Sequence, residues 1–425
     1  MRNRVVVTGM GVVAPNAHGL GAFEDALREG RSGIRFIPKL EELKFSCQVG
    51  GVPQGFDNIR VKYFDEEKLL SINDNIGYAS VAAIDAWVDA GFKVPPSNSG
   101  NADWDTGAVI GSGIGGMDTI GEKIVPMVNA GKVRRLGSTM VEQVMNSGVS
   151  ASIAGLLALG NQVTSNSSAC STGTEAMYDA MKIIRMGLAK RMLAGGSEGS
   201  SHYIWAGFDS MRVLSRKFND RPEAASRPMS ATASGFIPGS GSGVLMLEEL
   251  ESAKQRGARI YAEIIGAAVN CGGHRNGGTM TAPNPEGVQR CIKSAVSDAG
   301  ISLQQIDAIS GHLTATFADP GEVENWSKAL ERGPETFPYI NSTKSMLGHC
   351  LGATGAIESI AVILQLCKGF LHPSINCEDV HPEIAAFADK IPHTVMEYPD
   401  LKIIAKASFG FGDVNSCLIF KKWEE

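Results

Sequence analysis

The sequence predicts an α/β fold, and three observations support this prediction. Short apolar runs rich in β-branched residues alternate with longer amphipathic or small-residue stretches, a pattern typical of α/β proteins. The linkers between these stretches are short. The chain has 425 residues, of which 43% are hydrophobic. It can therefore bury a large core, and its size suggests two domains or one large duplicated unit.

In the first part of the chain, the apolar runs VVVT, GAVI, RMLA and GVLMLE are short and contain few charges. They predict strands at residues 5–8, 107–110, 191–194 and 243–248. Longer amphipathic or small-residue stretches follow or precede them. These stretches predict helices at residues 21–29, 75–90, 148–158 and 174–186.

The second part of the chain repeats this alternation. The runs YAEIIGA, AIS, IIAKAS and SCLIF predict strands at residues 261–267, 308–310, 403–408 and 416–420. Helices are predicted at residues 286–299, 321–330 and 355–366. Residues 163–184 and 338–364 also share one plan, in which a strand is followed by Asn-Ser, a turn with a reactive residue and a small-residue helix. Either an internal repeat or chance similarity of two common α/β units explains this likeness.

Cys170 lies in the most informative stretch, VTSNSSACSTGTEAM at residues 163–177. Small residues on both sides allow a sharp turn, and a thiol at the start of the following helix would feel the helix dipole, which favours the thiolate. We expect a nucleophile at this turn. A buried structural cysteine is the alternative, because reactivity also needs an electropositive setting.

Two histidines lie in comparable settings. His312 and His349 each follow a short apolar run and lie among glycines and hydroxyl side chains, with Lys344 five residues before the second. Functional groups of α/β proteins usually lie on such loops beyond strand ends or at helix starts. The six other histidines lack this context.

Together these motifs resemble those of the β-ketoacyl-acyl carrier protein synthases, condensing enzymes of the thiolase superfamily. The likeness covers nearly the whole chain, and its most specific parts are the Lys344-to-His349 spacing and the run SFGFG at the C-terminal end. The other motifs that carry it are RVVVTGMG at residues 4–11, VIGSGIGG at 109–116, RPMS at 227–230 and SGFIPGSG at 234–241.

The resemblance implies a thiolase-like duplicated fold with α/β/α/β/α layers. Its N-terminal half would span residues 1–254 and its C-terminal half residues 255–425. Residues 117–148 would be an insertion in the first half, which in this family helps to build the dimer and the acyl pocket. A homodimer is therefore expected.

The resemblance also implies the active-site roles. Cys170 would be the nucleophile, and the backbone N–H groups of Cys170 and Phe411 would stabilise the tetrahedral oxyanion. His312 and His349 would donate to the enolate oxygen. Lys344 would lie behind both imidazoles, supporting them and keeping them neutral by like-charge repulsion.

An acidic pair, Asp319 and Glu322, lies one residue closer to His312 than in the family pattern. By resemblance it supports the site, with Glu322 as the expected partner of Lys344 and Glu324 as an alternative partner. The competing interpretation is a solvated helix start, where carboxylates are common.

Substrate contacts are expected from the remaining family positions. Thr314 and Thr316 would hold the pantetheine arm, and Ile114 would set acyl depth. Thr281 and Phe409 would complete the substrate-binding set. The chain departs from the family pattern at Leu313, Asp413 and Val414, and it places polar residues in the insertion at Glu142 and Gln143. If these two side chains point into the acyl pocket, a polar or conjugated acyl chain is expected. If they face the dimer interface or solvent, an ordinary saturated chain is expected.

The activity implied is acyl transfer to Cys170, followed by decarboxylative Claisen condensation with malonyl-acyl carrier protein, extending the chain by two carbons in fatty acid biosynthesis. One alternative is a ketosynthase of a specialised type II polyketide or polyene pathway. The other is a non-catalytic ketosynthase-like partner subunit, against which Cys170 argues. A degradative thiolase would need a second catalytic cysteine, for which only Cys417 is available, and an initiating synthase would carry Asn instead of His349.

Composition limits the partners. The net charge of −6 and the lack of a long basic run argue against nucleic acid. Eight scattered cysteines without a CxxC pair fit a reducing cytoplasm, and no metal-ligand spacing occurs, so we expect no metal. The reaction that the resemblance implies requires no dissociable cofactor. We expect neither a signal sequence at the start of the chain, which reads as a strand, nor a membrane-spanning run of roughly 18 apolar residues. An acidic carrier protein would meet a basic surface, for which the candidates are Lys62, Lys132, Arg134, Arg135 and Lys217.

Overall fold

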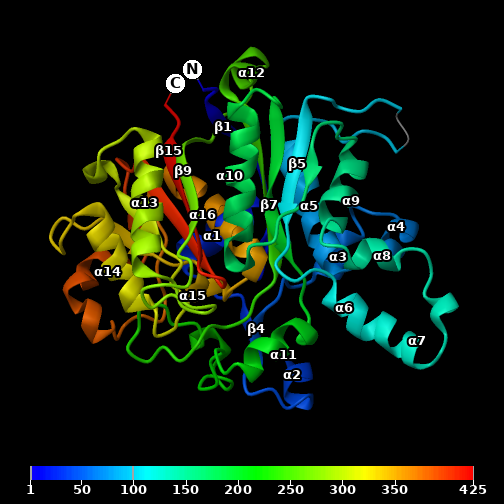
Figure 1. Ribbon diagram of the computed structural model, residues 1–425, viewed down its shortest axis with the longest axis horizontal. Coiled ribbons are helices and arrows are strands. Elements are labelled where there is room, and N and C mark those ends of the chain that lie inside the picture. The colour runs from blue at the N-terminus through cyan, green and yellow to red at the C-terminus, as the bar shows by residue number, and fades with distance from the viewer. Residues whose placement is uncertain (1, 98–99, 425) are drawn as a thin grey trace.

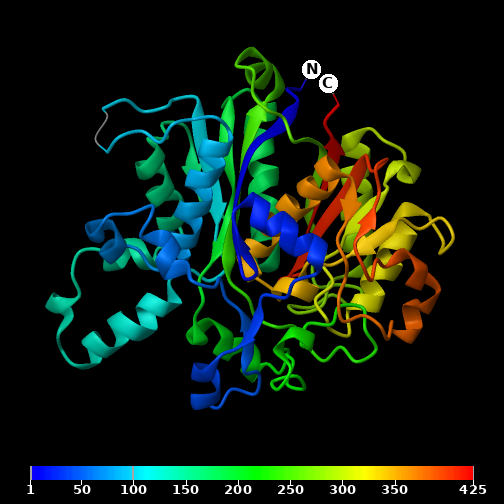
Figure 2. The ribbon, with the colours of Figure 1, turned by 180° about the vertical axis from the view of Figure 1, so that it is seen from behind.

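A long mixed β-sheet runs through the protein, as the computed structural model shows for residues 2–97 and 100–424 (Figures 1 and 2). Its strand order is β11-β10-β14-β15-β9-β1-β8-β7-β5-β6, and β2 pairs with β1 outside this path. The strands are β1 (Val5–Ala14), β2 (Ala17–His18), β5 (Thr106–Gly111), β6 (Val163–Thr164), β7 (Arg191–Glu198), β8 (Gly241–Glu249), β9 (Ala262–Cys271), β10 (Ala308–Ser310), β11 (Tyr339–Asn341), β14 (Ile403–Gly410) and β15 (Val414–Lys422).

The sheet consists of two halves with one plan. Each half contributes five strands to this order, which in chain order are β1, β5, β6, β7 and β8 in the first half and β9, β10, β11, β14 and β15 in the second. In each set of five, the first strand pairs antiparallel with the fifth, and the fifth pairs antiparallel with the fourth. The fourth then pairs parallel with the second, and the second pairs parallel with the third. The halves meet where β1 pairs with β9, at Val6 opposite Glu263. The predicted duplicated α/β fold is confirmed. The division between residues 254 and 255 falls within α12 (Leu250–Gln255) and stays a prediction.

Helices form three layers around the two half-sheets. In the middle layer, α10 (Thr172–Arg185) and α16 (Thr354–Lys368) contact each other and strands of both halves. On the outer face of the N-terminal half lie α5 (Asp74–Asp89) and α9 (Gly148–Leu157). On the outer face of the C-terminal half, α13 (Pro285–Ala299) packs on the sheet and α14 (Asp319–Leu330) packs on α13. Figure 1 shows α10 between the two groups of strands.

Burial on both faces explains why the strands are almost continuously apolar. In β8, Leu245 and Leu247 face the middle-layer core, whereas Val244 and Met246 face the outer core of the N-terminal half. Successive side chains of a strand point to opposite faces, so a strand covered by helices on both sides has no polar face. The same alternation in β15 divides its residues between the middle layer and the outer core of the C-terminal half.

One expectation from the sequence, that the chain contains no long apolar run, is wrong for the middle layer. The helical stretch Leu351–Lys368 has a mean hydropathy of 1.3 over 18 residues, long and apolar enough to cross a membrane, although the sequence was expected to contain no such run. It is 89% buried inside the protein, between the half-sheets. Its apolar character is therefore explained by its place in the core.

Every predicted strand and helix overlaps an observed one, and several short elements add to them. The inserted arm contains α6 (Met117–Thr119), the π-helical turn η1 (Ile120–Ile124), α7 (Val125–Asn129), η2 (Val133–Arg135) and α8 (Met140–Val144), and it projects from the body in Figure 1. The site described below uses η3 (Ala169–Ser171), α11 (His202–Ser210), α15 (Lys344–Leu347) and η6 (Leu351–Ala353). The remaining elements are α1 (Leu20–Glu29), β3 (Ile34–Phe36), α2 (Pro38–Glu42), β4 (Val49–Gly51), α3 (Phe56–Arg60), α4 (Glu66–Ser71), η4 (Pro222–Ala224), η5 (Leu303–Gln305), β12 (Phe370–Leu371), η7 (Pro382–Lys390) and β13 (Met396–Glu397).

Candidate active site

Cys170 lies in the tight turn η3, directly before the central helix α10. Ala169 has a φ of 49°, in the left-handed region that is unfavourable for a residue with a Cβ. Two hydrogen bonds hold this turn: the Ser168 N–H donates to Thr172 Oγ1 (2.8 Å), and the Thr172 hydroxyl donates to the Ala169 carbonyl (2.7 Å). The turn presents Cys170 to a cavity at the start of the helix, where the sequence predicted it.

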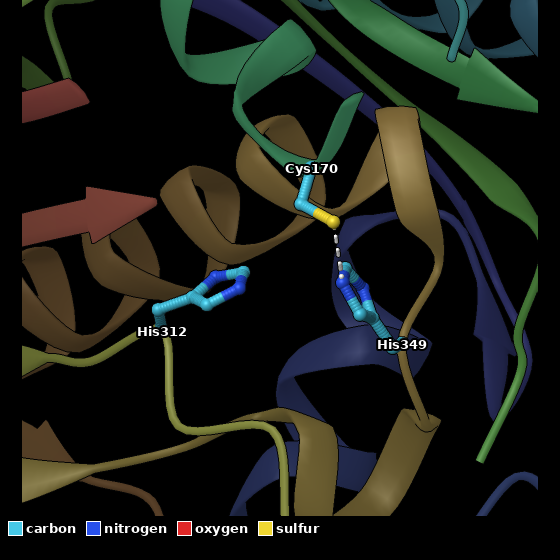
Figure 3. A group of neighbouring side chains, drawn as sticks. All are labelled: Cys170, His312 and His349. Atoms are coloured by element: carbon cyan, nitrogen blue, oxygen red, sulfur yellow. Dashed lines mark hydrogen bonds between the residues drawn. The ribbon is translucent and has the colours of Figure 1, made fainter. Parts of the chain in front are cut away.

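His349 faces the thiol from the loop between α15 and η6. Its Nε2 lies 2.9 Å from Cys170 Sγ (Figure 3). Its Nδ1 lies 3.2 Å from the backbone N of Leu351 and 2.9 Å from the hydroxyl of Thr354. Because the Leu351 N–H can only donate, Nδ1 is an acceptor and the proton of the neutral ring lies on Nε2. His349 therefore presents an N–H donor to the cavity.

His312 approaches from the other side of the cavity, on the loop between β10 and α14 (Figure 3). Its ring centre lies 5.4 Å from that of His349, with an interplanar angle of 83°. Its Nδ1 is buried without a hydrogen-bond partner among the described residues. Since no protein group fixes this side of the ring, His312 can also carry its proton on Nε2 and donate to a bound group.

Two carboxylates at the start of α14 hold the His312 loop. Glu322 accepts the N–H groups of His312 (2.6 Å) and Leu313 (2.7 Å), one on each oxygen. Asp319 accepts those of Thr314 (2.9 Å) and Ala315 (3.0 Å). Leu313 and Ala315 have positive φ values of 29° and 63°, so these hydrogen bonds hold the loop in an unfavourable backbone conformation.

The predicted partner of Lys344 is wrong. Its Nζ lies 2.5 Å from Oε1 of Glu358 in α16, and both side chains are 2% exposed. Glu322 makes no ion pair with Lys344 among the described residues, and its two oxygens accept the backbone N–H groups of His312 and Leu313 instead. The alternative, Glu324, lies on the exposed face of α14, 2.6 Å from Lys328. The solvated-helix interpretation also fails, since Asp319 and Glu322 are only 2% and 8% exposed.

Burial and charge keep the imidazoles neutral. Burial lowers the pKa of His312 and of His349 well below the usual value, and the positive charge of Lys344 lowers each pKa further. Cys170, His312 and His349 also form a possible set of metal ligands, because the Cys170 sulfur and one nitrogen of each histidine lie within 4.8 Å of one another. In the described part of the chain, this is the group of side chains able to hold a metal ion, and its soft sulfur and imidazole ligands would favour a thiophilic one.

The resting thiol is protonated. Burial raises the pKa of Cys170 to about 11, against the opposing effects of Lys344 and of the Phe411 backbone N–H. The expectation that the helix start favours the thiolate is therefore outweighed by desolvation. The backbone N–H groups of Phe411 and of Cys170 each lower the pKa of the thiol, which indicates that both are directed toward the sulfur. Gly410 permits this approach, because a Cβ there would lie only 3.2 Å from the Cys170 nitrogen.

The cavity at Cys170 has a volume of about 340 Å³. The imidazoles of His312 and His349 form its polar end, and hydroxyl groups line its rim. Thr314 and Thr316 lie with their hydroxyl oxygens 3.1 Å apart, and Thr281 is exposed on a neighbouring loop. Its apolar wall consists of Phe208, Val213, Phe236, Leu351, Phe409 and Phe411.

Three residues predicted to shape the acyl pocket do not line this cavity. Ile114 is 38% exposed, and its N–H donates to the buried carboxylate of Glu198. Glu142 is exposed. Gln143 is buried, and its side chain hydrogen-bonds to Thr119 and Lys123 in the inserted arm. The depth-setting role of Ile114 stays a prediction, and Glu142 and Gln143 provide no polar wall for an acyl chain here.

Asp413 is buried rather than a free charge. It is 1% exposed, has a φ of 60°, and its carboxylate accepts the N–H groups of His274 (2.9 Å) and Asn284 (2.8 Å). Its backbone oxygen also accepts the N–H of Gly272 (2.9 Å). Asp413 thus ties the loop at residues 272–284, which carries Thr281, to the turn that carries Phe411.

Three buried charges around the site, at Glu198, Glu358 and Lys406, were not expected from the sequence. Lys406 is the one charged residue of β14, and Glu358 is the one charged residue of α16 before its last residue, Lys368, a signal that the sequence does contain. Glu198 lies at the end of β7, which also contains Arg191. Glu198 accepts the N–H groups of Gly113 (2.9 Å) and Gly352 (3.0 Å), joining the two halves. The aromatic residues Phe208 and Phe236 were also missed, and no local motif marks them.

Known proteins share this arrangement of chain and fold. Residues 2–253 match the family described as "Beta-ketoacyl synthase, N-terminal domain", and residues 261–378 match "Beta-ketoacyl synthase, C-terminal domain". The chain is 36% identical to the chloroplastic 3-oxoacyl-[acyl-carrier-protein] synthase I of Arabidopsis thaliana, with 100% of this chain and 87% of that protein covered. It is 35% identical to 3-oxoacyl-[acyl-carrier-protein] synthase 2 of Vibrio harveyi, with both chains covered completely.

A solved complex is also similar over the full length of both chains, with a TM-score of 0.87 and 31% identity. Its title describes a type II PKS acyl-carrier protein in complex with its ketosynthase bound to the hexaketide.

Proposed function

The chain belongs to the beta-ketoacyl synthase family, and on that basis we propose that it is a 3-oxoacyl-acyl carrier protein synthase that lengthens acyl chains by two carbons in fatty acid biosynthesis. It is an acyltransferase-type condensing enzyme. One observation carries the proposed mechanism: Cys170 Sγ faces two buried, neutral imidazoles and two backbone N–H groups in one cavity.

In the first half-reaction, Cys170 Sγ attacks the carbonyl carbon of an acyl thioester. A new C–S bond forms, the bond to the carrier thiol breaks, and the proton of the Cys170 thiol ends on the departing thiol. The tetrahedral oxyanion is stabilised by the backbone N–H groups of Cys170 and Phe411, whose position near the sulfur supports this role. The positive charge of Lys344 favours the attacking thiolate and opposes part of the effect of burial.

In the second half-reaction, a malonyl thioester binds in the same cavity and loses carbon dioxide. The electron pair of the broken C–C bond forms an enolate, which attacks the acyl carbon on Cys170. The C–S bond breaks, and Cys170 leaves as a thiolate that takes a proton from water to restore the resting thiol. The developing enolate oxygen needs donors rather than bases. The Nε2–H of His349 and the facing ring of His312 supply them, and neutral imidazoles avoid protonating the carbanion.

The substrates arrive as thioesters of a carrier's phosphopantetheine, and these steps use no dissociable cofactor. The hydroxyls of Thr314, Thr316 and Thr281 would hold the amide groups of that arm, and the aromatic wall, with Phe409, would hold the apolar part; their position along the same cavity supports this. An acidic carrier protein would dock beside the rim. Of the five basic candidates, all of them exposed, Lys217 lies closest in sequence to a residue that lines the cavity, Val213.

We infer a homodimer that works in the cytoplasm. Exposed apolar side chains on the inserted arm support self-association, namely Val125, Val128, Val133, Val141 and Met145. All eight cysteines are free in the described residues, which supports a reducing compartment.

A second candidate function is that of a ketosynthase in a specialised type II polyketide pathway. The similarity to the ketosynthase of the carrier-protein complex favours it, and so do the departures at Leu313, Asp413 and Val414. The two candidates share the mechanism and differ in the acyl chain that is accepted.

A panel of acyl-carrier thioesters tests the proposal by intact-protein mass spectrometry. We expect an acyl adduct on the wild-type protein and none on Cys170→Ala, with the most rapidly transferred chain identifying the pathway. A preference for saturated chains supports fatty acid elongation, whereas a preference for polyketone or polyene chains supports the second candidate. Absence of any adduct on the wild-type protein would overturn both.

A further inference from the structure

Lys406 is a fully buried ammonium with no role in the mechanism above. It lies in the middle of β14, with 0% exposure, inside the run IIAKAS. Burying a charge is costly unless it is paired and hydrogen-bonded. A lysine at this place therefore has partners that explain it.

Its ionic partner is the carboxylate that also binds Lys344. Oε1 of Glu358 lies 2.5 Å from Lys344 Nζ, and Oε2 of the same residue lies 3.1 Å from Lys406 Nζ. Two ammonium groups thus share one carboxylate, and all three side chains are at most 2% exposed. The cluster carries a net positive charge behind the active site, where negative charge develops in both half-reactions.

The hydrogen bonds of Lys406 lead to the nucleophile and to the oxyanion donors. Its Nζ donates to Thr174 Oγ1 in α10 (3.0 Å) and to the Ser408 hydroxyl near the end of β14. The hydroxyls of Thr174 and Ser408 lie 2.9 Å apart. The Ser171 hydroxyl, next to the nucleophile, donates to the carbonyl of Ser408 (3.2 Å). Lys406 therefore fastens the start of α10, which begins beside Cys170, to the strand end that leads to Phe411.

We propose that Lys406 is a positioning residue of the condensation reaction, one that fixes the two oxyanion N–H donors relative to each other and adds the positive charge that keeps both imidazoles unprotonated. This role rests on the function proposed above. The effect of its charge on the imidazoles is supported by the pKa values of His312 and of His349. The charge of Lys406 lowers both, although burial and Lys344 lower them more.

Removal of Lys406 leaves a charge-balanced core. In Lys406→Met, Glu358 still pairs with Lys344, so the variant does not bury an unpaired carboxylate. The imidazoles would then feel a weaker positive field, and their protonation would occur at higher pH. The other charged or titratable groups around the imidazoles stay unchanged in this variant; they are Cys170, Glu198, Asp319, Glu322, Lys344 and Glu358.

The test is a single-turnover condensation between isolated acyl-Cys170 enzyme and malonyl-carrier protein, measured from pH 4 to pH 9. This range separates protonation of the imidazoles, whose pKa values lie well below the usual value, from protonation of Glu322, whose pKa is about 7; the acidic limb is the lower of the two steps. We expect Lys406→Met to lower the rate at neutral pH roughly tenfold, less than the loss of a direct oxyanion donor. We also expect the acidic limb of its pH profile to move to higher pH. Lys406→Arg, which keeps the charge, should keep the limb at the wild-type position even if its rate falls.

Arg256→Met is the matched control. Arg256 is also one of two cations that share a buried carboxylate, since Glu248 lies 2.7 Å from Arg256 and 4.0 Å from Arg191. Its other hydrogen bond goes to the Ala90 carbonyl, so it does not join the segments that carry Cys170 and Phe411. The control should lose stability without moving the acidic limb. If Lys406→Met does not fold, Lys406→Gln makes the same comparison. An unchanged limb in the folded neutral variant would overturn the inference, whereas failure of wild-type enzyme to form the acyl adduct would overturn the proposed function instead.

Discussion

The carboxylate of Glu322 controls the position of His312, and replacing it with Gln isolates that effect. Each oxygen of Glu322 accepts one backbone N–H of the His312 loop, at 2.6 and 2.7 Å. Glutamine keeps one acceptor but turns an NH₂ group toward the other N–H. A hydrogen bond to a charged group contributes about 1.5–3 kcal/mol, so we expect the free energy of unfolding to fall by about 2–3 kcal/mol.

The catalytic effect should separate the two half-reactions. Movement of the His312 ring by about 1 Å would slow condensation roughly 10- to 100-fold. Acylation of Cys170 should change little, because the histidine that contacts the sulfur is His349. Burial raises the pKa of Glu322 to about 7. The difference in condensation rate between wild type and Glu322→Gln should therefore be largest near pH 8, where the wild-type carboxylate is ionised. This difference should become smaller at lower pH, because protonation removes an acceptor from the wild-type residue.

Rapid-quench measurement of acylation and of condensation checks this prediction, with Glu324→Gln as the control. Glu324 lies two residues further along the same helix, but its carboxylate is exposed and paired with Lys328. The control should match wild type in both steps. If Glu322→Gln condenses at the wild-type rate at pH 8, or if acylation falls as much as condensation, the assigned role of Glu322 is refuted.

Two further predictions concern the loop tie and the thiol. Asp413→Asn should release residues 272–284, raising the KM for carrier thioesters severalfold and speeding proteolysis at exposed Arg275. The control is Asp307→Asn, which also loses a carboxylate that accepts two backbone N–H groups and should change neither the KM nor proteolysis. Equal behaviour of the two variants would contradict the assigned role of Asp413 in holding this loop. Because burial raises the pKa of Cys170 to about 11, its alkylation by iodoacetamide should accelerate roughly tenfold per pH unit between pH 7 and pH 10. Rapid alkylation that is already independent of pH at pH 7, in peptide maps of this residue, would instead show a resting thiolate.

Most of the strands and helices could be predicted from local sequence patterns. Strands such as β8 and β15 are covered on both faces, so their apolar runs stand out in the sequence, and the helices between them show regular amphipathic or small-residue stretches. Short elements such as β6 and β12 contain only two residues each and have no period to detect. Their pairing is determined by the neighbouring strands rather than by their own residues.

The site divides in the same way. Cys170, His312 and His349 lie in glycine- and hydroxyl-rich turns, which local sequence does reveal. The partner of Lys344 was missed because the pairing depends on how α15 packs against α16, not on spacing from His312. The state of the thiol was missed for a similar reason: the sequence shows the helix start, but the depth of burial that opposes the thiolate arises only from the packed layers.

The most direct test of the central claim follows carbon through one turnover. Wild-type enzyme acylated on Cys170 is mixed with malonyl-carrier protein labelled with ¹³C at all three malonyl carbons, and product and gas are analysed by mass spectrometry. Decarboxylative condensation predicts a β-ketoacyl product that carries two labelled carbons and one labelled carbon dioxide per turnover, with neither formed by Cys170→Ala. A product that retains all three labelled carbons, or an extended product made by Cys170→Ala, would contradict the assignment of the chemistry to Cys170 and its two histidines.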